Sequence, residues 1–200
     1  METIIFATKN KGKIKEINAI LADVPDVEVV SMEEAGITVD VVEDGTTFES
    51  NAMKKAIEIM EASGKITLSD DSGLEIDAMD KAPGVYSARF MGEDTPYPER
   101  FVAIFEKLKD VPKEGRTARF VSCIGCAFPD GRRFSTYDTV EGYIGYEAKG
   151  ENGFGYDPIF VSDELGECLA VVSPEEKNRI SHRGKALRKM KEILKEELIK

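Results

Sequence analysis

The feature that most constrains the fold is a pair of long strand-type segments, residues 117–128 and 132–144, separated only by Pro129-Asp130-Gly131. A short connection made of turn-forming residues predicts a hairpin of antiparallel strands. In the rest of the chain, helical and strand-type patterns alternate. An antiparallel hairpin in such a chain argues against a purely parallel sheet. We therefore expect an α/β protein with a mixed β-sheet and flanking helices.

The hydrophobic patterns predict the remaining elements. The helix before Gly64 has capping-box spacing, with Thr46 as N-cap and Glu49 three residues later. Asn10 is the expected N-cap of the first helix. Further strands are expected at 3–8, 26–31, 65–69, 74–79, 158–162 and 167–172, and helices from residue 10 to Leu21, from 46 to 63, from 98 to 109 and from 183 to the C-terminus.

The charge balance limits the classes of partner. The 200 residues include 27 basic and 38 acidic side chains, which gives a net charge of −11. Such a charge argues against general binding of nucleic acids. No apolar run has the length of a membrane span, and the first residues do not resemble a signal peptide. We expect a cytoplasmic protein with no nucleic-acid or membrane partner.

The cysteines are expected to pack in the core. Cys123 and Cys126 form a CxxC pattern within a strand-type segment, where positions three apart face opposite sides of the sheet. A zinc or redox site needs both sulfurs on one side, and the chain has no second CxxC or histidine pair.

An acidic pair, Asp70-Asp71, follows the strand-type segment Ile66-Thr67-Leu68. Adjacent carboxylates repel each other, and a hard cation such as Mg²⁺ would relieve that repulsion because it prefers carboxylate and phosphate oxygens. Solvated turns contain such pairs too. A further acid, Glu43, lies just before the second helix, where acids often serve only as helix-dipole partners. A metal site becomes the better interpretation if Glu43 lies close to Asp71.

The segment that joins the first strand to the first helix suits a phosphate. Backbone N–H groups at the helix start and a local positive charge together bind anions. The pattern is not a Walker A loop, and an ordinary basic first turn is the alternative. Its residues are Thr8, Lys9, Asn10, Lys11, Gly12 and Lys13.

Two later segments offer groups for a flat ligand. In residues 150–158 glycines flank Phe154, so that backbone can approach a ring while the phenyl group stacks on it. A glycine-rich turn with a packed aromatic is the alternative. Residues 177–183 contain the only histidine, His182, among basic neighbours, with Ser181 as a candidate N-cap of the last helix. A lone histidine is usually structural, but the polar, cationic setting suits hydrogen bonds to purine carbonyls or ring nitrogens better than it suits a core.

Six motifs in this order resemble the inosine triphosphatase family, the non-canonical purine nucleoside triphosphate pyrophosphatases. The match extends over nearly the whole chain, and Tyr156 stands where some members carry Trp. The motifs are residues 8–13, residues 47–52 with Lys55, residues 70–74, Pro83-Gly84-Val85-Tyr86-Ser87-Ala88-Arg89, residues 153–158 and Ser181-His182-Arg183.

The resemblance implies an elongated mixed sheet with helices around it, in one domain of two lobes with the active site in the central cleft, and a homodimer. It implies hydrolysis of ITP, dITP and XTP to the monophosphate and pyrophosphate, which would cleanse the nucleotide pool of deaminated purines. Mg²⁺ would be the cofactor, bound by Glu43 and Asp71, with Asp70 as a further or indirect ligand. Asp71 would accept the proton of the attacking water.

The resemblance also divides the substrate contacts. The segment 8–13 would hold the triphosphate, with added charge from Lys55. Lys or Arg donors facing O6 and N7 of a 6-oxo purine would disfavour adenine, which presents an amino group there. The nucleoside contacts are expected from Ser72, Phe154, Gly155, Tyr156, Asp157, Lys177, His182 and Arg183.

Three other functions fit parts of the pattern. A haloacid-dehalogenase-like phosphatase would release phosphate, but its two acids are separated by one residue, whereas here they are adjacent. A nucleotide sensor would bind ITP or XTP without turnover. A Maf-type pyrophosphatase acting on modified pyrimidine or methylated nucleotides would need an opening motif rich in serine and arginine, which this chain lacks.

Overall fold

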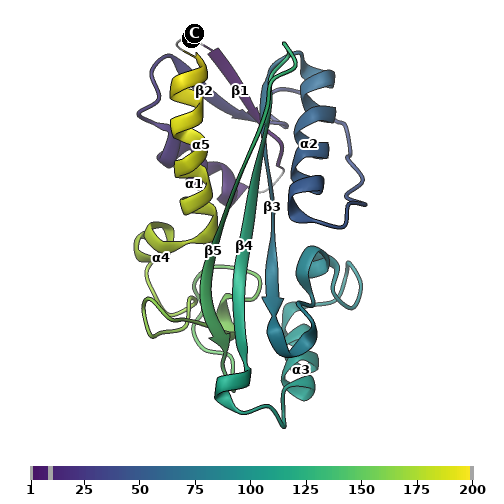
Figure 1. Cartoon of the computed structure of the whole chain (residues 1–200), viewed down its shortest axis with the longest axis vertical. Helices are drawn as coiled ribbons and strands as arrows, with labels where there is room; N and C mark the ends of the chain where they lie inside the picture. The colour runs from purple at the N-terminus through teal and green to yellow at the C-terminus, as the bar shows by residue number, and fades with distance from the viewer. Residues whose placement is uncertain (1, 9–10, 199–200) are drawn as a thin grey trace. The chain divides into compact units, whose positions relative to one another are not determined.

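The structure is a computed structural model that describes residues 2–8 and 11–198. It contains a mixed sheet of six strands in the order β2-β1-β3-β4-β5-β6, with helices around it (Figure 1). β1 runs parallel to β2 and β3, whereas β6 is antiparallel to β5. The predicted fold class is thereby confirmed. The strands are β1 Glu2–Phe6, β2 Val27–Ser31, β3 Ile66–Ile76, β4 Thr117–Ala127, β5 Arg133–Ile144 and β6 Phe160–Ser162; the α-helices are α1 Lys11–Leu21, α2 Phe48–Ser63, α3 Tyr97–Lys107, α4 Pro174–Ile180 and α5 His182–Leu198.

The chain divides into two compact units. Unit 1 comprises Met1–Asp71, Ser122–Asp138 and Arg183–Lys200, and unit 2 comprises Ser72–Val121 and Thr139–His182. Strands β3, β4 and β5 each continue from one unit into the other. Each unit has a hydrophobic core of its own.

In unit 1 the sheet is covered by α1 and α5 on one face and by α2 on the other (Figure 1). Ile17 of α1 and Met190 of α5 are fully buried against Ile4 and Leu68 of the strands. Helix α2 packs closely on Gly125 of β4, because a Cβ atom there would lie 2.9 Å from the backbone of Ala52. The cores on both faces therefore fix β3, the strand that carries the acidic pair.

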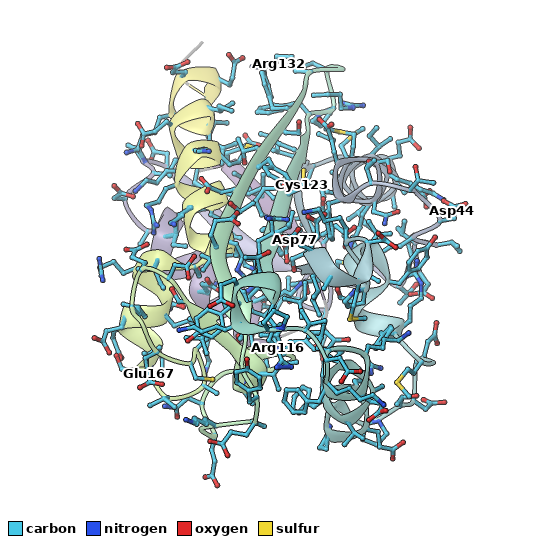
Figure 2. All side chains as sticks on the ribbon, turned by 60° about the horizontal axis from the view of Figure 1, so that its bottom comes forward. Asp44, Asp77, Arg116, Cys123, Arg132 and Glu167 are labelled. Carbon is cyan, nitrogen blue, oxygen red and sulfur yellow. The ribbon has the colours of Figure 1, made fainter. Side chains whose placement is uncertain are left out.

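In unit 2 a second core gathers around α3 and the far halves of the long strands. Ile104 and Leu108 are fully buried with Leu74, Ile144 and Phe160. On the same strands Arg119 pairs with Asp77 at 3.1 Å and with Glu141 at 3.0 Å (Figure 2 labels Asp77). Hydrogen bonds from Arg119, Lys81 and Thr117 hold the pKa of the Asp77 carboxyl well below its usual range.

The cysteines are packed in the core, as predicted. Cys123 and Cys126 are buried and are not in a disulfide. Burial raises the pKa of each thiol to about 12, so neither is a reactive thiolate at neutral pH. Cys123 lies among packed side chains of β4 in Figure 2. None of the helices in residues 2–8 and 11–198 is long and apolar enough to cross a membrane.

Several predicted boundaries were wrong. The N-cap of α2 is Thr47 rather than Thr46, and its capping box pairs with Ser50 rather than Glu49. The acidic pair does not separate two strands, because β3 runs without interruption from Ile66 to Ile76 and residues 77–79 form a 3₁₀ turn. Residues 167–172 are not a strand and contribute only the bridge of Cys168 to Val161.

The last helical region also differs from the prediction. Lys177 does not open the final helix but lies in the separate helix α4, whose N-cap Ser173 forms a capping box with Glu176. Ser181 is the C-cap of α4, and α5 begins at His182. The N-cap predicted at Asn10 lies outside the described residues. The remaining elements were confirmed to within one to three residues, including the hairpin of β4 and β5 and the αL cap at Gly64.

Candidate active site

A buried charge cluster in unit 1 is centred on Asp70. Lys13, on the first turn of α1, lies 2.6 Å from Asp70 Oδ2, and Arg183 Nε donates to the same oxygen at 3.0 Å. Ser122 Oγ donates to Asp70 Oδ1 at 2.8 Å. Arg183 also pairs with Glu16 at 3.1 Å. Both oxygens of Asp70 thus accept bonds from side chains that the fold brings to β3 from α1, β4 and α5.

This cluster fixes the charge of its members. Burial alone would raise the pKa of Asp70, but Arg183 and Lys13 outweigh that effect and hold it well below its ordinary value. Burial lowers the pKa of Lys13, and although the Asp70 carboxylate opposes this effect, the charges of Arg183 and Lys55 add to it. Asp70 therefore remains ionised and holds two cations, Lys13 at the start of α1 and Arg183 at the start of α5.

Asp71, the next residue of β3, has a different environment. It is buried, and its Oδ2 atom has no hydrogen-bond partner among the described residues. Burial and the neighbouring Glu43 carboxylate raise the pKa of Asp71 to about 6, while the charge of Lys55 opposes them. A carboxylate that titrates near neutral pH and has an unsatisfied oxygen is suited to accept a proton or to bind a cation.

Glu43 is brought to Asp71 by α2. Lys55 forms an ion pair with Glu43 and also donates to the backbone oxygen of Asp70 at 3.2 Å. Asn51, buried one turn before Lys55, accepts a hydrogen bond from Gly45 N at 2.7 Å. The loop that carries Glu43 is therefore tied to α2, where the Glu43 carboxylate is near enough to Asp71 to raise its pKa.

The residues fit a divalent cation that is completed by its substrate. No group of three or more His, Cys, Asp or Glu side chains in the described part of the chain forms a closed metal cage. Mg²⁺ is commonly bound by one or two carboxylates together with water and substrate phosphates. Glu43 and the unsatisfied Oδ2 of Asp71 match that pattern.

Unit 2 holds the second group of predicted site residues. The Asp157 carboxylate pairs with the Lys177 ammonium and accepts a hydrogen bond from Phe154 N at 2.7 Å. Lys177 Nζ lies 4.5 Å from the centre of the Phe154 ring, which is 51% exposed. A side chain at Gly153 would strike the Asp157 carboxylate at 2.1 Å. The arrangement presents an exposed ring beside a cation whose position is fixed.

Other predicted residues are placed differently. Tyr156 is buried, and its hydroxyl donates to the Ser87 carbonyl at 2.8 Å, so its ring is not a wall open to solvent. His182 is buried and stacks on Phe120 at 5.1 Å. Ser72 is partly buried. Lys9 and Asn10 lie outside the described residues, as do the side chains at Lys11 and Gly12.

Some residues that organise the cluster were not predicted. Glu16 and Ser122 hold Arg183 and Asp70, and Asn51 holds the Glu43 loop. The spacing of Asn51 and Lys55, one helical turn apart, was a usable signal. No sequence signal pointed to Ser122 or Glu16, because the partner of Ser122 lies 52 residues away in the sequence and that of Glu16 lies 167 residues away.

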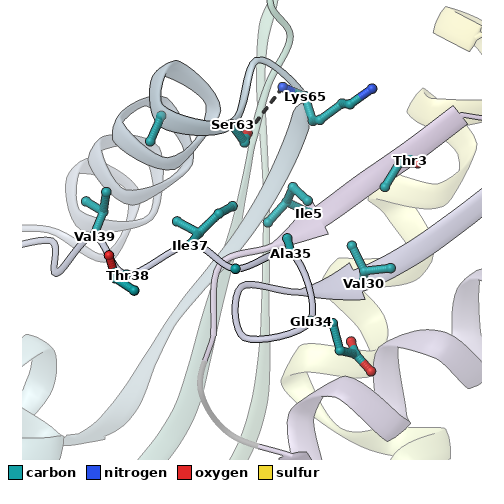
Figure 3. A pocket seen from close by; sticks show the side chains of 12 residues that line it. Thr3, Ile5, Val30, Glu34, Ala35, Ile37, Thr38, Val39, Ser63 and Lys65 are labelled. Atoms are coloured by element: carbon teal, nitrogen blue, oxygen red, sulfur yellow. Dashed lines mark hydrogen bonds between the residues drawn. The ribbon is translucent and has the colours of Figure 1, made fainter.

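A hollow of about 620 Å³ in unit 1 lies outside this arrangement (Figure 3). None of the predicted site residues lines it. Its walls come from β1, β2, the turn after β2 and the end of α2, including Ile5, Val30, Glu34, Ile37, Ser63 and Lys65.

Comparison with known proteins identifies the family. A family model described as the Ham1 family matches residues 4–193. The chain belongs to the Ham1 family. It is 46% identical over 191 residues to the dITP/XTP pyrophosphatase of Exiguobacterium sibiricum, with 96% of each chain covered. It is 42% identical over 194 residues to the enzyme of that name from Bacillus subtilis, covering 97% of this chain and 98% of the relative.

Solved Ham1 structures have the same fold. The Staphylococcus aureus Ham1 protein superposes with a TM-score of 0.89 at 38% identity, covering 98% of this chain and all of that one. A HAM1 protein from Coxiella burnetii gives a TM-score of 0.90 at 35% identity, with the same coverage. The predicted resemblance to the inosine triphosphatase family is confirmed.

Proposed function

We propose that this Ham1 protein is a nucleoside triphosphate pyrophosphatase that hydrolyses dITP, ITP and XTP to the monophosphate and pyrophosphate. It would thereby remove deaminated purines from the nucleotide pool. The observation that carries the proposal is similarity over nearly the whole chain to several proteins named dITP/XTP pyrophosphatase. The charge cluster of unit 1 and the ring-and-cation pair of unit 2 support it.

The groups of unit 1 would act on the triphosphate. Lys13 and Lys55 are cations held in place by the carboxylates of Asp70 and Glu43. The phosphate oxygens of an incoming polyphosphate can pair with these ammonium groups as well. Thr8 would add a hydroxyl group, and Lys9, Asn10, Lys11 and Gly12 stay predictions for the same role. Asp70 keeps Lys13 and Arg183 in position, and its expected role as a further or indirect ligand of the metal stays a prediction.

Glu43 and Asp71 would hold Mg²⁺. When bound, the ion supplies neutralisation of phosphate charge and a lowered pKa of bound water. Asp71 orients the attacking water and accepts its proton, for which a pKa of about 6 is well matched at neutral pH. Because phosphoryl transfer depends mainly on positioning and electrostatics, a cluster already fixed by the fold is suited to it.

The groups of unit 2 would select the base. The exposed Phe154 ring offers a stacking face, and Lys177 offers a donor for O6 of a 6-oxo purine. An adenine amino group facing that cation would lose the hydrogen bond, which costs up to a few kcal/mol. Contacts from Ser72, Gly155, His182 and Arg183 stay predictions, as do action as a homodimer and a cytoplasmic location.

The test is a turnover panel of dITP, XTP, ITP, dATP and dGTP with Mg²⁺, in which pyrophosphate and phosphate are detected separately. We expect pyrophosphate from the first three. Asp71→Asn should abolish it, whereas Asp44→Asn should not, because Asp44 is an exposed acid that pairs with Lys54. Phosphate as the product would favour a phosphatase, and binding without turnover would favour a nucleotide sensor.

A further inference from the structure

The motif at residues 83–89 has no part in the chemistry proposed above, although it helps to define the family resemblance. It lies in unit 2, where Gly84–Arg89 form a run of 3₁₀ helix. Ser87 is buried in it. Its contacts lead to the loop that carries Phe154 and Asp157, and these contacts suggest what the motif does.

A buried arginine holds this segment in shape. The Arg100 side chain is 2% exposed, and its guanidinium lies 4.8 Å from the centre of the Tyr97 ring. Nη1 and Nη2 donate to four backbone oxygens rather than to a carboxylate. The acceptors are Ser87 O at 3.0 Å, Ala88 O at 2.9 Å, Gly92 O at 3.0 Å and Glu93 O at 3.4 Å.

Ser87 connects the segment to its surroundings through both its side-chain hydroxyl and its backbone carbonyl. Its hydroxyl accepts a hydrogen bond from Leu74 N at 2.8 Å and donates to Gly84 O at 2.6 Å. Its carbonyl accepts from Arg100 and also from the Tyr156 hydroxyl at 2.8 Å. A carbonyl that receives two buried donors fixes the position of both of them.

Tyr156 connects Ser87 to the loop that carries Phe154 and Asp157. Its ring meets Tyr97 edge to face at 5.2 Å. On one side is Gly155, whose φ of +64° places it in the left-handed region. On the other is Asp157, which holds both Lys177 and the backbone N–H of Phe154. The contacts thus run continuously from Arg100 through Ser87 and Tyr156 to the exposed ring and its cation.

We propose that Arg100 and Ser87 are positioning residues for recognition of the base, and that they act through the hydroxyl of Tyr156. They touch no substrate themselves. They fix the loop so that Lys177 faces O6 of a 6-oxo purine at hydrogen-bonding distance. The inference rests on the proposed function. It assigns selectivity among bases to a buried network that holds the loop, in addition to the groups that meet the base.

The test measures selectivity as the ratio of kcat/KM for dITP to that for dATP, which does not depend on the fraction of enzyme that is folded. In Tyr156→Phe, which removes only the hydroxyl, we expect KM for dITP to rise about fivefold to tenfold and the ratio to fall by a similar factor. Arg100→Met should do the same. Arg100→Lys should give a ratio between those of Arg100→Met and the wild type, because an ammonium can donate to some but not all of the four carbonyls.

Two controls separate this role from a structural one. Tyr143→Phe removes a hydroxyl elsewhere in unit 2, from a ring that lies under Lys113, and should leave the ratio unchanged. Inhibition by tripolyphosphate, which has no base, should be the same in every variant because the triphosphate groups belong to unit 1. Selectivity equal to that of the wild type in Tyr156→Phe and Arg100→Met would overturn the inference alone. Absence of dITP turnover by the wild-type protein would overturn the proposed function, and this inference with it.

Discussion

Asp70 and Asp71 are neighbours with opposite electrostatics, and the difference comes from the direction in which each side chain points. Successive residues of a strand face opposite sides of the sheet. Asp70 meets Lys13, Arg183 and Ser122, whereas Asp71 meets Glu43 and has one oxygen without a partner among the described residues. One carboxylate is therefore stabilised in its charged form, and the other is held ready for a proton or a cation.

We expect Asp71→Asn to abolish turnover and to stabilise the metal-free protein at pH 7.5. The pKa of Asp71 rises from 3.8 to about 6 on folding, so the native state binds this proton more tightly than the unfolded state does. The charged form therefore destabilises the fold above pH 6, by at most about 3 kcal/mol, and this cost vanishes as the pH falls below 4. Urea unfolding of the wild type and of Asp71→Asn at pH 7.5 and pH 4 measures the difference in their free energies of unfolding. A gain of equal size at both pH values would show that the carboxylate charge is not its cause.

Replacement by methionine should destabilise the protein at one buried arginine and have little effect at another. Arg183 pairs with Asp70 and Glu16, so that Arg183→Met takes one buried cation away from two buried carboxylates and should cost about 3–5 kcal/mol. Arg116 stacks on Tyr146 at 4.1 Å, but its Nε and Nη1 have no hydrogen-bond partner among the described residues. Arg116→Met should change stability by about 1 kcal/mol or less. Denaturation midpoints compare the two, and a large loss in Arg116→Met would reveal a partner for its guanidinium.

At the scale of elements, helix α2 supports the groups proposed to bind the metal. It carries Lys55 and Asn51, which hold the Glu43 loop, and it packs closely on Gly125 of β4. Gly125→Ala would place a Cβ atom 2.9 Å from the backbone of Ala52, so the helix must shift. We expect a loss of about 1–3 kcal/mol and a higher KM for every nucleotide, since the triphosphate groups move.

Gly145→Ala is the matched control for that substitution. Its Cβ atom would meet nothing closer than 3.5 Å, and its backbone is not left-handed. It should therefore leave stability and KM nearly unchanged. A KM in Gly125→Ala equal to that of the wild type, at a lower denaturation midpoint, would mean that α2 can shift without moving Lys55.

The elements that sequence predicted well are those whose apolar pattern is local. The hairpin of β4 and β5, helix α2 and helix α5 have long regular patterns. Strand β3 was divided in two because Ser-Asp-Asp-Ser-Gly is a polar run, and its burial depends on Lys13, Ser122 and Arg183 far away in the chain. Helix α4 was missed because it has only seven residues. Long-range charge pairing is therefore what the sequence alone did not reveal.

At the scale of the molecule, the chain passes between its two units at four points, and two of them fall within predicted site motifs. These are Asp71–Ser72 and His182–Arg183. The motifs could be recognised from sequence, and so could their order. The partners inside each unit could not be predicted, because Glu16, Ser122 and Arg100 contribute through contacts that no local pattern encodes. Recognition of the family predicted the chemistry, whereas the structure explains why Asp70 stays ionised and why the pKa of Asp71 is raised.

The whole enzyme should show competition between protons and Mg²⁺. Above pH 6 Asp71 is ionised and can both accept a proton and bind the cation, so we expect kcat/KM for dITP to fall as the pH drops through about 6. Because proton and metal would share one carboxylate, a tenfold rise in Mg²⁺ should move this midpoint down by up to about one pH unit. Profiles at several Mg²⁺ concentrations measure the shift, and Asp44→Asn, which alters an acid next to Glu43, should give the same profiles as the wild type. A midpoint that does not depend on Mg²⁺ would separate the titrating group from the metal site and would require a base other than Asp71.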